Sequence, residues 1–190
     1  MSSSADVRSI LRRLKPEKRR GPLRRRGVSD LPFVEWASHL PRVLLYDTTV
    51  YVDILQGRFP AAGDVAIRAA DAWHSTVTEA ELIAPCGFLN PDHPSTLETT
   101  KQITAVIERR PAHRTIGPDR EIWMVAGILS GILARLQGYG RAERRRVLND
   151  ALIFATARKH GMTVLTRNAD DFDFLQQLEP SARVVFYERQ

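Results

Sequence analysis

The chain has 190 residues, of which 43% are hydrophobic and 26% are charged, and its formal net charge is +6. This length predicts one domain with a substantial core and a short appendage. No apolar run approaches the roughly 18 residues that a membrane-spanning helix needs, and the residues after Met1 lack the apolar segment of a secretory signal. The lone Cys86 excludes an internal disulfide and a zinc or iron–sulfur site built from thiolates. We therefore expect a cytoplasmic protein that does not enter a membrane.

The positive charge is concentrated at the start of the chain. Residues 1–26, here called the basic arm, carry ten basic and two acidic side chains, a net charge of +8. The rest of the chain, 27–190, carries 18 basic and 20 acidic side chains, a net charge of −2. We therefore divide the chain into a basic arm with its connector at residues 1–40, expected to be partly disordered, and a globular domain at 41–190. Such an arm is attracted to polyanions without reading their sequence, although a solubilising tail is the alternative.

Strand-like and helix-like segments alternate along the first half of the chain. Short apolar runs rich in β-branched residues indicate buried strands, and apolar residues at helical spacing indicate helices. In chain order, these patterns predict a short basic helix at 7–14, a strand at 42–46, helices at 50–55 and 63–73, a strand at 75–77, and a helix that Thr78 caps and that Pro85 ends or kinks.

The second half continues this alternation. The patterns predict a helix at 97–110, a brief strand at 113–116, a long helix from Asp119 to Gly138, a helix at 151–159 capped by Asn149 and Asp150, a strand at 162–165, a helix at 168–175 and a strand at 184–187. Short apolar strands separated by helices form a sheet that is mostly parallel and covered on both faces. The predicted fold class is therefore α/β, a three-layer α/β/α sandwich with a mostly parallel central sheet.

Acidic side chains lie close to the predicted strands in several separate stretches. Asp47 follows the first strand, Glu81 lies in the first turn after the second, and Asp150 begins the helix that leads into the fourth. Ligands of open α/β sheets bind beyond the carboxyl ends of the strands, so we expect these carboxylates to converge there. Three further polar side chains follow the fourth strand, those of Asn168, Asp170 and Asp171.

Converging carboxylates repel one another unless a divalent cation lies between them. A ligand set made of oxygens alone suits Mg²⁺ or Mn²⁺ and does not suit Zn²⁺. Such an ion binds a phosphodiester, generates a nucleophile from water and stabilises the leaving oxygen. Taken singly, each acid also has a structural explanation as a helix cap, a capping-box residue or a turn residue. Their joint occurrence at strand and helix ends favours a metal site.

Four stretches of this sequence resemble the PIN domain, and specifically the VapC-like toxins of type II toxin–antitoxin pairs. The stretches are LLYDTTVYVD at 44–53, STVTEAEL at 75–82, LNDALIFATARKHG at 148–161 and TVLTRNADDF at 163–172. The resemblance covers about residues 42–188, with the middle matching by layout alone. It departs from the family in the long stretch before the first strand, because PIN domains begin close to that strand.

The resemblance implies an endoribonuclease that depends on Mg²⁺ or Mn²⁺ and acts as the toxin of a toxin–antitoxin pair. It also implies RNA as the substrate, a small antitoxin protein as a partner, and a homodimer. The metal ligands and catalytic acids that it implies are Asp47, Glu81, Asp150 and Asp171, with Asp170 as the alternative fourth acid. The substrate-positioning groups that it implies are Thr48, Thr166 and Asn168.

A run of basic residues, Arg144-Arg145-Arg146, shortly precedes Asp150. Such a run is usually a solvated helix face, but at this place it is a candidate RNA-binding group beside the metal ligands. An alternative function is a catalytically inactive PIN-like module that binds nucleic acid or a partner. A DNA-directed nuclease of the flap type is a third hypothesis, but the sequence lacks the additional acidic residues and helical DNA-binding elements that such enzymes carry.

Overall fold

The computed structural model describes residues 6–37, 39 and 41–189, which fold around a parallel sheet of five strands. The strands are β1 (Val43–Tyr46), β2 (Asp71–Ser75), β3 (Thr115–Ile116), β4 (Thr163–Thr166) and β5 (Arg183–Phe186). Their order across the sheet is β3-β2-β1-β4-β5, with all four pairings parallel. The central β1 pairs with β2 and β4 at once, because Leu45 lies opposite both Trp73 and Val164.

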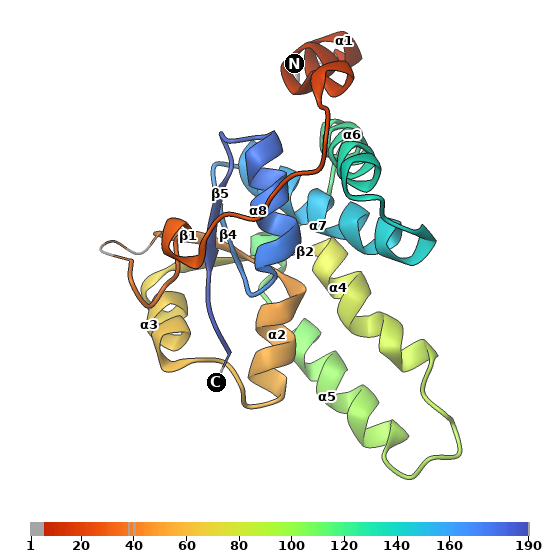
Figure 1. The fold of residues 1–190 in the computed structure, drawn as a ribbon. Helices are drawn as coiled ribbons and strands as arrows, with labels where there is room; N and C mark the ends of the chain where they lie inside the picture. Colours follow the sequence, from red (N-terminus) through yellow and green to blue (C-terminus); the bar gives the residue numbers. More distant parts are fainter. Residues whose placement is uncertain (1–5, 38, 40, 190) are drawn as a thin grey trace.

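Eight helices accompany the sheet in the described part of the chain (Figure 1). They are α1 (Val7–Leu14), α2 (Thr48–Leu55), α3 (Ala61–Ala69), α4 (Thr76–Ile83), α5 (Thr96–Glu108), α6 (Arg120–Gln137), α7 (Arg141–Lys159) and α8 (Ala169–Leu178). Helices α6, α7 and α8 pack on one face of the sheet, and α2 and α3 pack on the other. The α4–α5 pair extends away from the sheet on the side opposite α1 (Figure 1). None of the described helices is both long and apolar enough to span a bilayer.

Alternation along the strands supplies the two cores. Leu45 and Val164 point into the cluster formed with α6, α7 and α8, whereas Leu44, Leu165 and Val185 belong to the cluster on the α2 and α3 side. Because successive side chains of a strand point to opposite faces, each short strand fills both layers. The predicted three-layer α/β/α sandwich is confirmed, and the sheet is entirely parallel.

The prediction for the segment before the second strand is wrong. The helix expected at 63–73 ends at Ala69, and Trp73 lies inside β2, where it pairs with Leu45. The backbone becomes extended at Ala70, and Asp71 pairs with Val43, so pairing with β1 overrides the helical spacing of the apolar residues. The strand expected at 75–77 is also wrong in its bounds, because only Ser75 lies in β2, and Thr76 and Val77 begin α4.

The cap of α4 also differs from the prediction. Ser75 caps the helix, since its hydroxyl oxygen accepts a hydrogen bond from the amide of Val77 at 3.2 Å. Thr78 instead lies inside the helix, and its hydroxyl donates to the carbonyl of Tyr46 at 3.3 Å. Glu81 is consequently in the second turn of α4 and does not complete a capping box.

The helix expected at 151–159 begins earlier in the chain, at Arg141. Asn149 and Asp150, the predicted caps, are interior residues of a continuous α7. The stretch before them contains good helix formers and no glycine or proline, and the buried Val147 anchors it in the core. Helix α2 likewise begins at Thr48, with Asp47 as its cap. The remaining predicted helices and strands are confirmed with ends shifted by a few residues.

The basic arm is packed against the domain wherever it is described. Helix α1 buries Ile10 and Leu14 against α6. After α1 the chain passes along α8 in the opposite direction (Figure 1), so that Arg19 donates to the carbonyl of Leu178 at 3.0 Å and Arg26 pairs with Asp173. This differs from the expected loose tail, although residues 1–5, 38 and 40 lie outside the described residues. The division into two parts at residue 40 stays a prediction.

The connector is the segment between the basic arm and β1, and its residues 32–34 lie beside the outer edge of β5. The amide of Val34 donates to the carbonyl of Phe186, and the amide of Phe186 donates to the carbonyl of Pro32, both at 2.8 Å. Phe33 and Phe186 thereby form a parallel bridge, and their rings lie 5.7 Å apart. The segment before β1 therefore contacts the sheet as well as the helices.

Candidate active site

A cavity of about 510 Å³ opens at the carboxyl ends of β1 and β4. Asp47 directly follows β1 and caps α2, and Asn168 follows β4 and caps α8. The parallel pairing of β1 with β4 brings these two helix starts together. The lining side chains are those of Asp47, Thr48, Thr49, Val52, Glu81, Arg146, Asp150, Arg167, Asn168 and Asp170.

The carboxylate of Asp47 is buried and held through one of its oxygens. Its Oδ2 accepts hydrogen bonds from the hydroxyls of Thr49 and Thr166, each at 2.7 Å. Burial raises the pKa of Asp47, and these hydroxyls oppose that rise. Because both hydroxyls contact Oδ2, the other oxygen is available for a ligand in the cavity.

Glu81 reaches the same cavity from α4. Its Oε2 accepts from the hydroxyl of Thr48, and its Oε1 accepts from the side-chain amide of Asn149 at 2.8 Å. Burial raises the pKa of Glu81, and the charge of Asp47 adds a smaller upward contribution. The two acids are therefore close enough to repel each other.

Asp150 lies in the middle of α7 and is 5% exposed. Its Oδ2 accepts from the side-chain amide of Asn168 at 3.2 Å. Burial raises the pKa of Asp150 well above its usual range, and the charges of Asp47, Asp171 and Glu81 raise it further. Asp47, Glu81 and Asp150 line one cavity, and Asn168 joins Asp150 to Asp171, so the four predicted acids lie near one another.

The two candidates for the fourth acid lie in different surroundings. Asp171 is fully buried, and it accepts from Tyr139 at 2.9 Å, from Asn168 at 3.1 Å and from Arg146 at 3.1 Å. The side chain of Asp170 is 70% exposed at the cavity rim and pairs with Arg25 at 2.9 Å. Asp171 thus belongs to the hydrogen-bonded network of Asp150, whereas Asp170 does not.

Residues 44–176 match the family described as the PIN domain. The chain belongs to the PIN-domain family. Members of this family are usually nucleases, and these nucleases generally use divalent metal ions. No curated protein sequence matches the chain.

Solved structures of low sequence identity share the fold of this PIN domain. FitAcB from Neisseria gonorrhoeae is 21% identical, with a TM-score of 0.54, over 75% of this chain and 96% of that one. VapBC2 from Rickettsia felis is 15% identical, with a TM-score of 0.53, over 77% and 99% of the two chains. DNA-bound VapBC from Salmonella typhimurium is 18% identical, with a TM-score of 0.53, over 76% and 98%.

The donor chemistry of the PIN-domain cavity suits a divalent metal ion. As the side chains stand, the part of the chain that the structure describes holds no group of three or more Asp, Glu, His or Cys side chains arranged around one metal position. However, the acids that meet here offer only oxygen ligands, and burial together with their mutual repulsion raises the pKa of Asp150. A divalent cation between them would relieve that repulsion, so the residues fit a divalent metal ion.

The three predicted positioning groups hold the acids in place. Thr48 contacts Glu81, and Thr166 contacts Asp47. Asn168 is the most connected, because its single amide nitrogen donates to both Asp150 and Asp171. The structure therefore brings these groups into the site, while their action on a substrate stays a prediction.

Of the three arginines in the predicted RNA-binding run, one lines the cavity and two do not. Arg146 lines the cavity and pairs with Asp171. Arg144 donates to the carbonyl of Tyr139 at 3.0 Å, and neither it nor Arg145 is among the lining residues. Only the last arginine of the run is placed to contact a bound ligand in the cavity.

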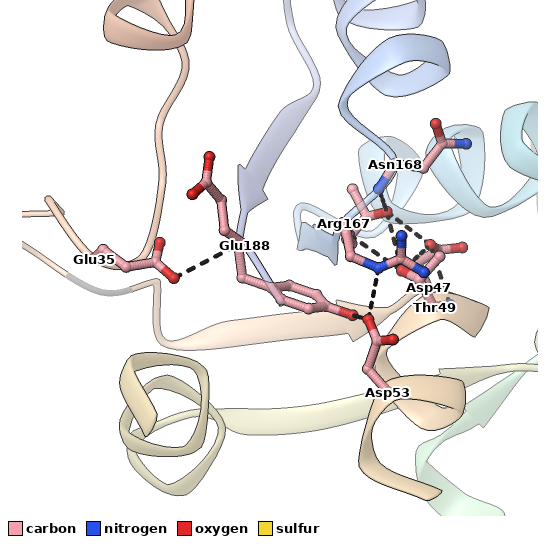
Figure 2. Close-up of polar contacts among 9 residues, drawn as sticks. Glu35, Asp47, Thr49, Asp53, Arg167, Asn168 and Glu188 are labelled. Atoms are coloured by element: carbon pink, nitrogen blue, oxygen red, sulfur yellow. Dashed lines mark hydrogen bonds and ion pairs between the residues drawn. The ribbon is translucent and has the colours of Figure 1, made fainter. Parts of the chain in front are cut away.

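An ion pair that was not predicted from the sequence lies beside the acids. Nε of Arg167 donates to Oδ2 of Asp53 at 2.7 Å, and Figure 2 shows Asp53 reaching from α2 toward Arg167. The hydroxyl of Tyr187 donates to the same oxygen at 2.9 Å. The available signals were an aspartate within the apolar run of α2 and an arginine between Thr166 and Asn168.

Proposed function

We propose that this PIN domain is a metal-dependent endoribonuclease that hydrolyses RNA phosphodiester bonds. The observation that carries the proposal is the meeting of Asp47, Glu81 and Asp150 at one cavity, with Asp171 joined to Asp150 through Asn168. These carboxylates come from four different helices or helix starts. Holding them together costs free energy in the absence of a cation, and a bound divalent cation would offset that cost.

The proposed ligands of Mg²⁺ or Mn²⁺ are Asp47, Glu81 and Asp150, with Asp171 as the fourth acid. When bound, the ion supplies Lewis acidity to the phosphodiester and activates the attacking water. The side chains around the acids restrict their rotation. Asp47, Glu81 and Asp150 each accept at least one hydrogen bond from a neighbouring hydroxyl or amide, and these donors come from Thr48, Thr49, Asn149, Thr166 and Asn168.

We further propose that the chain is the toxin of a toxin–antitoxin pair. The VapC-like motifs support this role, and so do the folds of FitAcB and VapBC, which resemble this chain. The proposed partners are a small antitoxin protein and a second copy of the chain. The buried side of α6 packs within its own chain, with Trp123 half exposed, so a dimer would use other surfaces of α6 or other elements.

A cleavage assay on total RNA tests the proposal, with and without added Mg²⁺ or Mn²⁺. The wild type should cleave only with the metal, and Asp47→Asn and Asp150→Asn should each abolish cleavage while the far-ultraviolet circular dichroism stays unchanged. Asp64→Asn, an exposed position on α3, is the matched control and should cleave normally. Metal-independent cleavage would contradict the proposal. RNA binding without any cleavage would support the catalytically inactive binding module instead.

A further inference from the structure

Two arginines are among the residues that line the cavity, and they differ in their partners. Arg146 pairs with Asp171, one of the four acids, so its charge compensates the proposed ligand set itself. Arg167 pairs with Asp53, which does not line the cavity. The charge of Arg167 is therefore compensated by an acid that lies outside the cavity and takes no part in the proposed metal site.

The ion pair of Asp53 and Arg167 fixes the arginine in one orientation. Asp53 is completely buried, and its Oδ2 accepts from both Arg167 and Tyr187. The backbone of Arg167 is also held, because its amide donates to the hydroxyl of Thr49 at 3.1 Å. Figure 2 shows Thr49 and Asp53, both from α2, beside Arg167. Both the backbone and the guanidinium of Arg167 are thus held before any ligand arrives.

Stability alone gives a weak reason for this arrangement. Oδ1 of Asp53 is buried and accepts no hydrogen bond from any described residue. A buried carboxylate with an unpaired oxygen costs free energy, and buried ion pairs generally contribute little net stability. The arrangement instead fixes the position of the Arg167 guanidinium at the edge of an acidic cavity.

The geometry leaves part of the guanidinium for a ligand. Asp53 accepts from Nε, so the two terminal nitrogens on the far side of the planar group remain able to donate. The side chain of Arg167 is 34% exposed and lines the cavity. A guanidinium offers paired donors that match the oxygens of a phosphate group. Thr166 and Asn168, its chain neighbours, contact the acids, so a phosphate on Arg167 would lie beside them.

We propose that Arg167 binds the phosphate backbone of the substrate through its terminal nitrogens, with Asp53 and Tyr187 as its positioning residues. This inference rests on the proposed function, because it takes RNA as the ligand of the cavity. The acids that line the cavity repel a phosphodiester. Arg167 supplies N–H donors for the phosphate, and its partner Asp53 does not line the cavity and so does not itself face the phosphate.

The test measures binding of a short fluorescein-labelled single-stranded RNA in the presence of Mg²⁺. Asp150→Asn is the common background, so that the probe is not cleaved. Adding Arg167→Gln should weaken binding by about 10- to 100-fold, the range expected for a lost charged hydrogen-bond pair. It should also reduce the slope of log K against log salt concentration by about 0.7, the contribution of one phosphate contact to a single strand.

Three further variants separate phosphate binding from a structural role. Arg167→Lys should restore the salt slope and only part of the affinity, since it keeps the charge and loses the planar donor pair. Asp53→Asn should weaken binding by less than Arg167→Gln, because the guanidinium is present but less well held. Arg68→Gln, an exposed arginine on α3, should leave both quantities unchanged. Thermal unfolding of each variant shows whether the fold is intact.

The possible outcomes are distinct. If the background protein binds RNA and Arg167→Gln changes neither affinity nor salt slope, the role of Arg167 is overturned while the proposed function stands. If Arg167→Gln and Arg167→Lys only lower the melting temperature, the arginine is structural and the inference is again overturned. If the wild type and the background protein both fail to bind or cleave RNA, the proposed function itself fails.

Discussion

Two buried aspartates of this molecule, Asp53 on α2 and Asp173 on α8, each hold an arginine but are satisfied to different degrees. Both are completely buried, and each accepts from an arginine Nε, at 2.7 Å from Arg167 and at 2.5 Å from Arg26. Asp173 also accepts from the backbone amide of Arg26 and from Gln177, both at 2.9 Å, so that both of its oxygens are used. Asp53 leaves Oδ1 without a donor among the described residues.

The difference separates an ion pair that stabilises the fold from one that positions a side chain. Fully hydrogen-bonded buried charges retain most of their favourable interaction, whereas an unpaired buried oxygen loses it. Asp173 therefore attaches the basic arm to α8. Asp53 gives up part of its hydrogen bonding and keeps Arg167 at the cavity. Four predictions test this comparison, in order of decreasing expected effect.

The first prediction tests whether the arm that Asp173 holds is part of the folded domain. Leu14→Ala should lower the free energy of unfolding by about 2 to 4 kcal/mol, because Leu14 is 1% exposed and its removal leaves a cavity against α6. Urea denaturation measures the change. Leu11 on the same helix is 39% exposed, so Leu11→Ala should lower the free energy of unfolding by less than about 0.5 kcal/mol. Equal effects for the two variants would show that α1 does not pack as described.

The second prediction concerns the attachment at Asp173. Asp173→Ala should lower the free energy of unfolding by about 2 kcal/mol, because three donors lose their acceptor while Arg26, which is partly exposed, can turn to water. The arm should also become a faster trypsin substrate, since Arg19 to Arg26 would leave α8 more often. Asp170→Asn, which alters an exposed ion pair of the arm, is the control. Unchanged proteolysis of the Asp173 variant would show that other contacts hold the arm.

The third prediction concerns Asp53. Asp53→Asn should lower the free energy of unfolding by about 1 kcal/mol, less than Asp173→Ala, because one of its oxygens has no hydrogen bond to lose. A double-mutant cycle with Arg167→Gln, followed by urea denaturation, should give a coupling energy of at least about 0.5 kcal/mol. A larger destabilisation than that of Asp173→Ala would remove the distinction between the two aspartates.

The fourth prediction concerns the rim of the cavity. Arg25→Gln should change the free energy of unfolding by less than about 0.5 kcal/mol, since its partner Asp170 is 70% exposed and surface ion pairs contribute little. Differential scanning calorimetry should show nearly the same melting temperature as the wild type. A large destabilisation would mean that the arm depends on this contact rather than on Asp173.

The position of the acids could be predicted because apolar runs in the sequence show where the strands end. Asp47 directly follows one apolar run and Asn168 lies shortly after another, and parallel strands place their carboxyl ends at one edge of the sheet. Asp150 was placed in the site for a partly wrong reason. The sequence predicts Asp150 as a helix cap, but it lies inside α7. From there it still lines the same cavity, and its neighbour Asn149 donates to Glu81.

The packing of the arm was not predictable from local patterns. Its contacts join residues far apart in the chain, and several are made by arginines to backbone carbonyls, such as Arg19 to Leu178 and Arg135 to Arg19. A run of arginines with two prolines and few apolar residues gives no local sign of such contacts. The excess of positive charge suggested either a polyanion-binding arm or a solubilising tail, and it gave no sign that Arg13, Arg25 and Arg26 would pair with acids of the domain.

The connector beside β5 affects how this protein behaves in a concentrated solution. Two backbone hydrogen bonds from residues 32–34 cover the outer side of β5, and the other outer strand, β3, spans only Thr115–Ile116. An uncovered edge strand presents free amides and carbonyls to which a strand of another molecule can add, and this is a common start of aggregation. A chain shortened to 41–190 would expose the hydrophobic Val184, Val185 and Phe186 strand in this way. The connector therefore protects the sheet from pairing with its neighbours.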